Sequence, residues 1–371
     1  MPPLSITPRE LVPSATTRRE FISWSGKAMG LLTLARMAAG PFDLLARTPP
    51  ALDPSRRVLV LIQLVGGNDG LNTLIPLDDD NYRRLRPTLG IAASQILPLT
   101  EHCGFHPSCR ALRDLCLAGK MTVVQNVGYA HPSRSHFRSS EIWAVGGRQR
   151  ESANDGWLGR YLDQMPLDDR EHAMPPMAAY LSEEMPYCIR NAAETSRSFP
   201  LARRSEGFSA SLQRIAGHIG SDSSTQIYVL SLGGFDTHSH QAHAHANLLR
   251  TLSTGLESFH QALTARGLDQ QVLTMTVSEF GRSAAENEAR GTDHGTAAPV
   301  FIMGPNLQGP VLGTPPGLDI SRHQDLVHST DFRQVYATVL EDWLGCTAEN
   351  VLETTVEKLP LFQASTTDVA L

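Results

Sequence analysis

The stretch VLVLIQLVGGNDGLN, residues 58–72, decides which fold this chain can adopt. Its first part, Val58–Val65, is apolar almost without interruption, which is typical of a strand buried on both faces of a parallel sheet. Gly66 and Gly67 then permit a sharp turn that leaves the carboxylate of Asp69 at the end of the strand. Taken alone, Asn-Asp-Gly also has the composition of an ordinary turn.

Four later runs repeat this pattern of nearly continuous apolar, β-branched residues. Each has the length of a strand, and glycine and polar residues lie at its end. We therefore expect these runs to join Val58–Val65 as buried parallel strands. The runs are Met121–Val127, Ile227–Leu232, Val272–Val277 and Pro299–Met303.

Helical patterns separate the apolar runs. Leucines and Phe259 recur at helical spacing over His245–Leu263, and a second pattern runs over Phe332–Leu344 and ends at Gly345, a typical C-cap residue. Strands that alternate with helices predict an α/β fold, a doubly wound, mostly parallel sheet with helices on both faces. Residues 165–225 are less periodic, and we expect them to form a covering insertion or a long excursion.

The N-terminus has the features of an export signal. The stretch TTRREFI, residues 16–22, pairs Arg18 with Arg19, and a weakly apolar run follows over residues 28–39. That run is too short and too interrupted to span a bilayer. We expect residues 1–46 to be a twin-arginine signal peptide and linker, and residues 47–371 to be a single domain. An amphipathic N-terminal helix is the alternative.

This signal predicts a periplasmic or extracytoplasmic protein whose partner is the twin-arginine translocase, with no stable membrane insertion of the mature chain. The formal charge of −6, with no basic run after the signal, argues against nucleic acid as a partner. Five cysteines do not indicate a disulfide framework. Cys103 and Cys109 are close enough in sequence to pair across a short loop, whereas Cys116 lies on an apolar helical face and is expected to be a buried thiol.

Polar residues follow the strand at Met121–Val127 in the stretch SRSHFRS, residues 133–139, which leads into a helix. A serine at a helix start, here Ser135, suits either a cap or a nucleophile that faces an anionic substrate. Arg134 and Arg138 have the chemistry to clamp a phosphate or sulfate, or they are surface charges.

The strand at Ile227–Leu232 is followed by GGFDTHSH, residues 233–240. Asp236 has His238 and His240 two and four residues further on, and carboxylate and imidazole are the usual ligands of zinc, manganese and iron. These residues can therefore converge on one cation. The alternative is a solvated, histidine-rich start of a helix.

The last two motifs are SEFGR, residues 278–282, after one strand, and GTDHG, residues 291–295, before another. They bring Glu279 and His294 toward the sheet edge expected for Asp69 and Asp236. Acid, histidine or serine at four strand ends indicates a functional site at that edge.

These motifs resemble those of the exported bacterial family of unknown function called DUF1501, and the resemblance covers nearly the whole mature chain. That family is similar to the alkaline phosphatase and sulfatase superfamily, which hydrolyses or transfers phosphate and sulfate esters with one or two metal ions. The motifs are RREF (18–21), GGNDGLN (66–72), RSHFRS (134–139), GFDTH (234–238), SEFGR (278–282) and GTDHGTAAP (291–299).

The resemblance implies ligands for one metal ion in full. In the superfamily, an Asp-x-x-x-His element and a later histidine before a strand bind this ion. Asp236, His240 and His294 match that element, with His238 as the alternative to His240. The divalent metal would be zinc, manganese or calcium.

The second metal position of the superfamily is matched only in part. Asp69 resembles its first aspartate and Ser135 its nucleophile, but the expected Asp-His pair appears here as Glu279-Phe280. Phenylalanine cannot bind a metal. The resemblance thus implies a one-metal site, a rearranged two-metal site in which His136 substitutes, or a lineage that has lost catalysis.

Our leading hypothesis is a metal-dependent hydrolase of small anionic phosphate or sulfate esters, in which a metal ion activates a hydroxyl nucleophile. The alternative is a catalytically degenerate, exported binding or scaffold protein that retains the fold. A serine hydrolase is disfavoured because no Gly-x-Ser-x-Gly elbow is present. The expected metal ligands are Asp69, Asp236, His238, His240, Glu279 and His294, and the expected catalytic residues are Ser135, His136, Glu279, Arg134 and Arg282.

Overall fold

The computed structural model describes residues 55–147, 155–165, 177–191, 198–202, 206–222 and 224–364. The compact unit that contains them runs from Asp53 to Leu371. The predicted signal and linker, residues 1–46, lie outside the described residues, so the export signal stays a prediction. Among the described residues, no helix has the length and apolar character needed to cross a bilayer.

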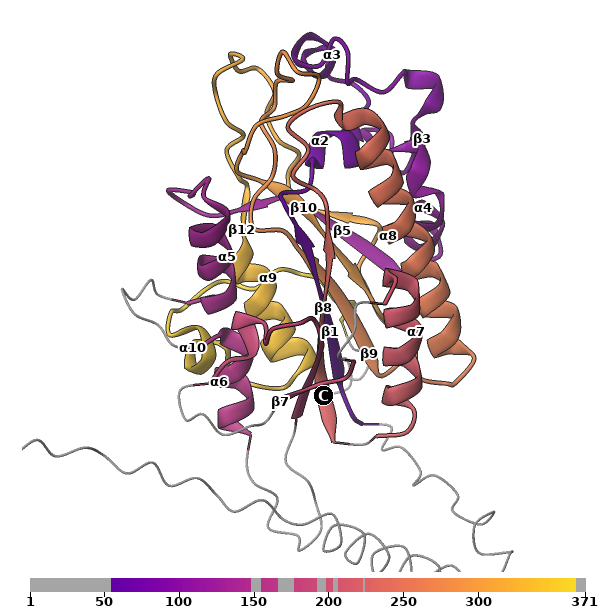
Figure 1. The fold of residues 1–371 in the computed structure, drawn as a ribbon, viewed down its shortest axis with the longest axis vertical. Helices are drawn as coiled ribbons and strands as arrows, with labels where there is room; N and C mark the ends of the chain where they lie inside the picture. Colours follow the sequence, from indigo (N-terminus) through magenta and orange to yellow (C-terminus); the bar gives the residue numbers. More distant parts are fainter. Residues whose placement is uncertain are drawn as a thin grey trace, which may run out of the picture. The chain divides into compact units, whose positions relative to one another are not determined.

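The centre of the unit is one large sheet, and the five predicted strands are all present in it (Figure 1). Its order is β11-β5-β10-β9-β1-β8-β6-β7, with β12 paired to β5. Strand β1 lies in the middle and pairs in parallel with β8 and β9. The predicted strands are β1 (Val58–Val65), β5 (Met121–Gly128), β8 (Thr225–Gly233), β9 (Val272–Val277) and β10 (Ala298–Met303).

Strand β10 departs from the prediction because it runs antiparallel to both of its neighbours, β5 and β9. All six of its residues are buried, and burial on both faces produces the same apolar run in either direction. Hydrophobicity therefore could not reveal the direction of this strand. Its reversal places the residues that precede β10 at the edge where β1, β8 and β9 end.

Helices cover both faces of the sheet, as predicted (Figure 1). On one side, stacked aromatic rings join the helices, with Trp143 and Phe332 centroids 4.4 Å apart and Trp157 and Tyr336 centroids 4.3 Å apart. That side contains α5 (His136–Val145), α6 (Trp157–Gln164), α9 (Phe332–Thr338), the π-helical turn η4 (Val339–Trp343) and α10 (Ala348–Leu352). The other contains α4 (Arg110–Leu117), α7 (Phe208–Ile219) and α8 (Gln241–Thr264).

The two predicted helical patterns are confirmed, with one change. Helix α8 buries Leu249, Leu252, Leu256 and Phe259 along one stripe. The pattern at Phe332–Leu344 continues from α9 into the wider turn η4, and Gly345 follows at a φ of 69°, a left-handed conformation that glycine adopts without strain.

The expectation of a covering excursion at residues 165–225 is wrong for the parts described. Two strands in this region, β6 (Met177–Leu181) and β7 (Ser198–Pro200), extend the large sheet beyond β8, and α7 follows them. Strand β6 has the sequence MAAYL and is only partly buried. It lacks the continuous β-branched run by which the central strands were predicted.

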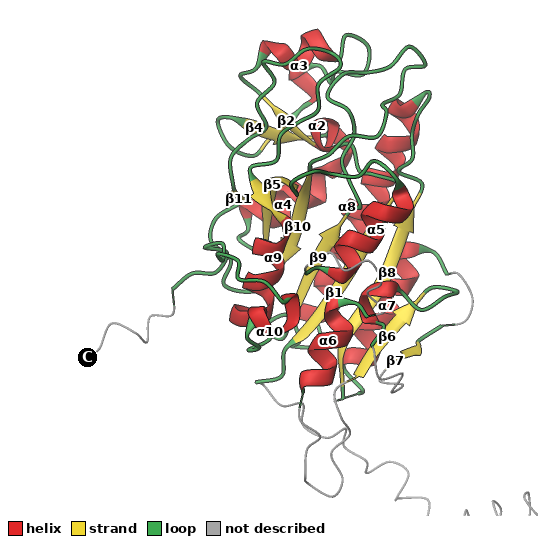
Figure 2. Cartoon of the chain, turned by 90° about the vertical axis from the view of Figure 1, so that its left-hand side faces the viewer, coloured by secondary structure: helices red, strands yellow, loops and turns green. Residues whose placement is uncertain are grey.

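A second, smaller sheet lies beside the large one (Figure 2). It has the order β2-β4-β3, formed by β2 (Leu74–Pro76), β4 (Cys103–Phe105) and β3 (Leu97–Pro98). Cys103 and Cys109 are both buried free thiols, and Cys116 is buried as predicted. The remaining elements are α2 (Gly70–Thr73), α3 (Asp80–Leu85), η1 (Ala93–Gln95), η2 (Pro107–Cys109), η3 (Tyr187–Ile189), β11 (Val311–Leu312) and β12 (Thr330–Asp331).

Candidate metal centre

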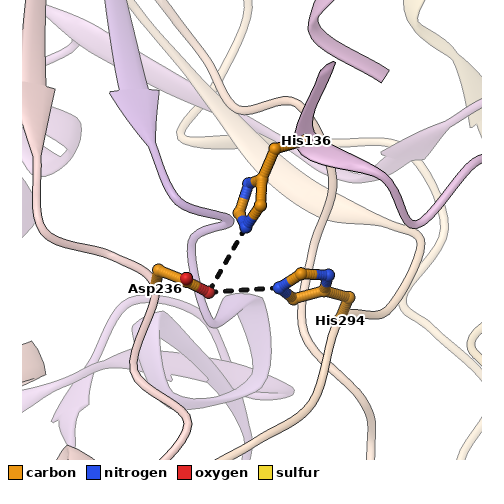
Figure 3. Close-up of side chains that lie close together, drawn as sticks. All are labelled: His136, Asp236 and His294. Carbon is orange, nitrogen blue, oxygen red and sulfur yellow. Dashed lines mark hydrogen bonds and ion pairs between the residues drawn. The ribbon is translucent and has the colours of Figure 1, made fainter. Parts of the chain in front are cut away.

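Four loops meet at the carboxyl edge of the central strands. Asp236 follows β8, Glu279 follows β9, His294 precedes the reversed strand β10, and His136 is the first residue of α5 after β5. In open α/β sheets this edge is the usual position of a ligand site. His136, Asp236 and His294 each have a ligand atom within 4.8 Å of the others. Figure 3 shows the imidazole rings of His136 and His294 directed at the Asp236 carboxylate.

One oxygen of Asp236 is the point on which this cluster converges. Its Oδ1 lies 3.1 Å from His294 Nε2, 3.0 Å from His238 Nε2 and 3.5 Å from His136 Nε2. The Nε2 atoms of His238 and His294 are themselves only 2.9 Å apart. We call His136, Asp236, His238 and His294 the Asp236 cluster.

Each imidazole of the Asp236 cluster has an acceptor at its other nitrogen. His136 Nδ1 lies 2.9 Å from Glu279 Oε1, and His294 Nδ1 lies 2.7 Å from the Arg134 carbonyl oxygen. His238 Nδ1 lies 3.5 Å from Asp293 Oδ1. Because a carbonyl or carboxylate accepts a proton donor, these partners assign the hydrogen of each neutral ring to Nδ1.

This assignment leaves three Nε2 lone pairs directed at a carboxylate oxygen. Such a group of acceptors is mutually repulsive unless a proton or a cation lies among them. Imidazole nitrogens and a carboxylate are the ligands that zinc and similar divalent metals prefer. Metal-bound histidines also typically donate their second N–H to a carboxylate or a carbonyl, and His136 and His294 have such partners here. The residues present therefore fit a divalent metal ion.

Arg282 anchors the carboxylate of the cluster. It is fully buried, and its Nη2 donates to Asp236 Oδ1 at 2.6 Å. Its guanidinium also donates to the carbonyl oxygens of Gly66, Gly67, Phe235 and Thr292. Burial opposes ionisation of Asp236, but the hydrogen bond and the positive charge of Arg282 outweigh it and hold the pKa of Asp236 at about 2. Arg282 thus faces Asp236 and backbone oxygens and is fully buried, so its guanidinium is not free to contact a substrate as the expected catalytic residue would.

Glu279 and Phe280 lie behind the histidines. Glu279 is buried, and its Oε1 accepts from Gly66 N at 2.7 Å as well as from His136. The Phe280 ring is 4.9 Å from the His136 ring and 4.6 Å from the His294 ring, centroid to centroid. Glu279 thus supports a histidine, and Phe280 packs where the superfamily resemblance would require a ligand.

Asp69 belongs to a different network. It is buried, caps α2 through Asn72 N, and its Oδ2 accepts from Arg86 and Gln241. Burial alone would raise the pKa of Asp69, but the adjacent Arg86 guanidinium lowers it below its ordinary value. The Asp69 carboxylate is paired with the Arg86 guanidinium and is not part of the Asp236 cluster.

Two other candidates lie beside the cluster. Ser135 is the exposed N-cap of α5, and its side chain makes no capping hydrogen bond. Arg134 is exposed and pairs with Asp325.

His240, the first choice of ligand after Asp236, does not join the cluster. It adopts a left-handed conformation, with a φ of 47°, at the start of α8, and it is His238 that reaches Asp236.

Sequence patterns did not identify two partners of the site residues. Asp293, whose pKa is lowered first by the Asn287 amide and further by His238, directly precedes His294 in the GTDHG motif. Arg86 lies 17 positions after Asp69, and no motif connects the two residues. A charged residue next to a predicted ligand was the available signal for Asp293.

The fold and the site together define an α/β protein with a candidate centre of three histidines and one carboxylate. Residues 190–344 match the model of a family described as "Protein of unknown function (DUF1501)". The matched range contains the GFDTH, SEFGR and GTDHGTAAP motifs, and the match supports the family resemblance there. No curated protein matches the sequence.

Several solved structures are similar to this chain at low sequence identity. The lipoteichoic acid synthase LtaP from Listeria monocytogenes is 8% identical, with a TM-score of 0.45 that covers 81% of this chain and 75% of that one. The C-terminal periplasmic domain of the phosphoethanolamine transferase EptC from Campylobacter jejuni is 9% identical, with a TM-score of 0.44 and coverage of 82% and 96%. A protein in the alkaline phosphatase superfamily from Vibrio parahaemolyticus is 10% identical, with a TM-score of 0.42 and coverage of 81% and 70%.

Proposed function

We propose that this protein is an exported, metal-dependent hydrolase of phosphate or sulfate esters. One observation carries the proposal: three imidazole Nε2 atoms converge on Asp236 Oδ1 while the Nδ1 atom of each ring faces an acceptor. This is the arrangement of metal ligands with their supporting hydrogen bonds in place. The motif resemblance supplies the reaction class.

His136, Asp236 and His294 would hold the metal ion, with His238 at the same carboxylate oxygen. A divalent ion bound there supplies a Lewis acid for the ester oxygen and lowers the pKa of a hydroxyl nucleophile. Glu279 keeps the proton of His136 on Nδ1, and the Arg134 carbonyl does the same for His294. The side chains thus present lone pairs, and not N–H groups, to the cation.

Ser135 is the proposed nucleophile. Its hydroxyl is exposed, makes no capping bond and belongs to the residue before His136, at a helix N-terminus that favours negative charge. The exposed guanidinium of Arg134, paired with Asp325, is the proposed contact for the substrate anion.

The paired arginines Arg18 and Arg19 support export by the twin-arginine translocase and thus a periplasmic or other extracytoplasmic location. The substrate would then be a small anionic ester outside the cytoplasm. Cargo of this route is folded before it crosses the membrane, so the metal ion would be acquired inside the cell.

A second candidate is an exported binding or scaffold protein without turnover. Phe280 favours it, because this ring packs against His136 and His294 at the position where the superfamily resemblance would require a metal ligand. Such a protein would bind the metal ion and hydrolyse nothing.

Elemental analysis of the exported protein, combined with an assay on chromogenic phosphate and sulfate esters, tests the proposal. We expect wild type to contain a divalent metal ion and to hydrolyse one of the two ester classes. His294→Ala should lose both properties. His260→Ala, a half-buried histidine on α8 outside the cluster, should retain both.

Metal without hydrolysis would favour the scaffold candidate. A metal-free wild type, whose melting temperature ignores added zinc or manganese and ignores chelator, would overturn the metal centre itself.

A further inference from the structure

The side chain of Gln241 joins the Asp69 network to the loops of the Asp236 cluster. Gln241 is the first residue of α8, and none of its surface is exposed. Its Nε2 donates to Asp69 Oδ2. Its Oε1 accepts from the hydroxyl of Thr237 at 3.0 Å and from the hydroxyl of Thr292 at 2.5 Å. Both lone pairs of this oxygen are therefore used.

These partners fix the orientation of the amide. Asp69 forms an ion pair with Arg86, so its side chain is a carboxylate, which only accepts hydrogen bonds. A flipped amide would place its oxygen against that carboxylate. The two threonine hydroxyls therefore donate to Oε1, and each polar group of the bridge faces a partner of the opposite kind.

The two threonines belong to the segments from which the histidines of the cluster project. Thr237 stands between Asp236 and His238 in the chain, and Thr292 lies two positions before His294. The backbone N–H of Thr292 also donates to the Thr237 carbonyl oxygen at 3.3 Å, so the two segments contact each other. A shift of either threonine would therefore move a histidine of the cluster.

The other end of the bridge is a fixed point of the fold. Asp69 and Arg86 are each only 1% exposed. Besides Asp69, the Arg86 guanidinium donates to the carbonyl oxygens of Ser283 and Ala284, both at 2.9 Å. A fully satisfied buried network of this kind is rigid. Gln241 thus ties the two segments to a group that does not move.

We propose that Gln241 is a positioning residue of the Asp236 cluster, which holds His238 and His294 in their places beside Asp236. Asp69 is not a ligand of this cluster, and it acts on the cluster through the Gln241 amide. The proposal rests on the proposed function for what the cluster binds. The bridge itself is a property of the metal-free chain.

Two variants break the bridge at different points. Gln241→Leu removes the amide and with it all three hydrogen bonds. The double variant Thr237→Val and Thr292→Val removes only the two hydroxyls and retains the bond from Gln241 to Asp69. This second variant tests the proposal even if Gln241→Leu does not fold.

Nuclear magnetic resonance of the histidine rings in the metal-free protein is the first measurement. We expect the ring signals of His238 and His294 to shift in both variants, because their segments lose the tie to Asp69. The ring signals of His260, on α8 outside the cluster, should stay at their wild-type positions.

Cobalt(II) is the metal probe for the second measurement, since its visible absorption reports the arrangement of its ligands. Each variant should bind cobalt(II) about tenfold more weakly than wild type, the lower end of the loss typical of a supporting partner. The absorption of the bound ion should change as well. A role in folding alone would change the melting temperature and leave the absorption of the bound ion as in wild type.

Matched controls remove the same groups elsewhere. Gln125→Leu removes a buried amide that donates to the Gly313 carbonyl oxygen, and Thr338→Val removes a buried hydroxyl on α9. Both controls should leave the His238 and His294 signals and the cobalt(II) affinity as in wild type.

Unshifted His238 and His294 signals in the variants, or equal shifts in the controls, would overturn the proposal. Wild-type cobalt(II) affinity in both variants would also overturn it. A wild type that binds no cobalt(II), with shifted ring signals in the variants, would support the bridge and overturn the metal centre instead.

Discussion

Glu279 provides the sharpest test of the proposed metal site. Its Oε1 accepts from His136 Nδ1 at 2.9 Å and from Gly66 N at 2.7 Å, and the side chain is buried. Loss of such an outer partner typically weakens metal binding by about 10- to 100-fold. Glu279→Gln retains an oxygen for both hydrogen bonds and removes only the charge, so we expect a loss near tenfold, or about 1.4 kcal/mol. Glu279→Ala removes both bonds, and we expect a loss near 100-fold.

Competition against a chromogenic chelator at constant pH measures these affinities, and the melting temperature of the metal-free protein measures folding separately. Glu286→Ala is the matched control. Glu286 is equally buried, at 7% exposure, and accepts from the backbone N–H groups of Thr88 and Leu89, away from the cluster. Both alanine variants leave buried N–H groups unpaired, at a cost of about 1–3 kcal/mol in folding stability. If Glu279→Ala binds metal like wild type, or loses no more affinity than Glu286→Ala, the support assigned to Glu279 is wrong.

Two further outcomes are expected. Burial lowers the pKa of His245 to about 4, so its stabilising neutral form is complete above the ordinary pKa of 6.5 and is lost as pH falls through about 4. Between these two pH values the free energy of unfolding falls by about 3 kcal/mol because of this one group. Denaturant titrations should therefore show a flatter dependence of unfolding free energy on pH for His245→Phe. A slope equal to that of wild type would contradict this prediction. Replacement of Arg18 and Arg19 by lysine should leave the precursor in the cytoplasm with its domain folded. Cell fractionation measures where the protein accumulates. Export of this variant by the twin-arginine route would contradict the signal assignment.

The central strands could be predicted because burial on both faces leaves a continuous apolar run, as in Val58–Val65 and Val272–Val277. The direction of β10 could not, because a strand buried in either direction has the same composition. Strands β6 and β7 were missed because short, partly buried strands near the edge of a sheet do not need β-branched runs.

The candidate site also could be predicted from the sequence only in part. Position after a strand predicted that Asp236 and Glu279 would share one edge of the sheet. His294 precedes β10 and lies at that edge because β10 is reversed. The choice between His238 and His240 depends on the left-handed backbone at His240, which the spacing of the residues does not reveal. Arg86 determines the place of Asp69 through a contact between distant parts of the chain. Such a contact has no local sequence signature.

Arg282 explains how these separate loops form one rigid site. Its guanidinium binds backbone oxygens after β1, after β8 and before β10, and it donates to Asp236 as well. A single buried cation thus fixes the ends of three strands and the carboxylate on which the histidines converge. Because these bonds lie within the protein, the position of Asp236 does not depend on a metal ion. An ion that entered the proposed metal site would therefore find its carboxylate ligand already in place.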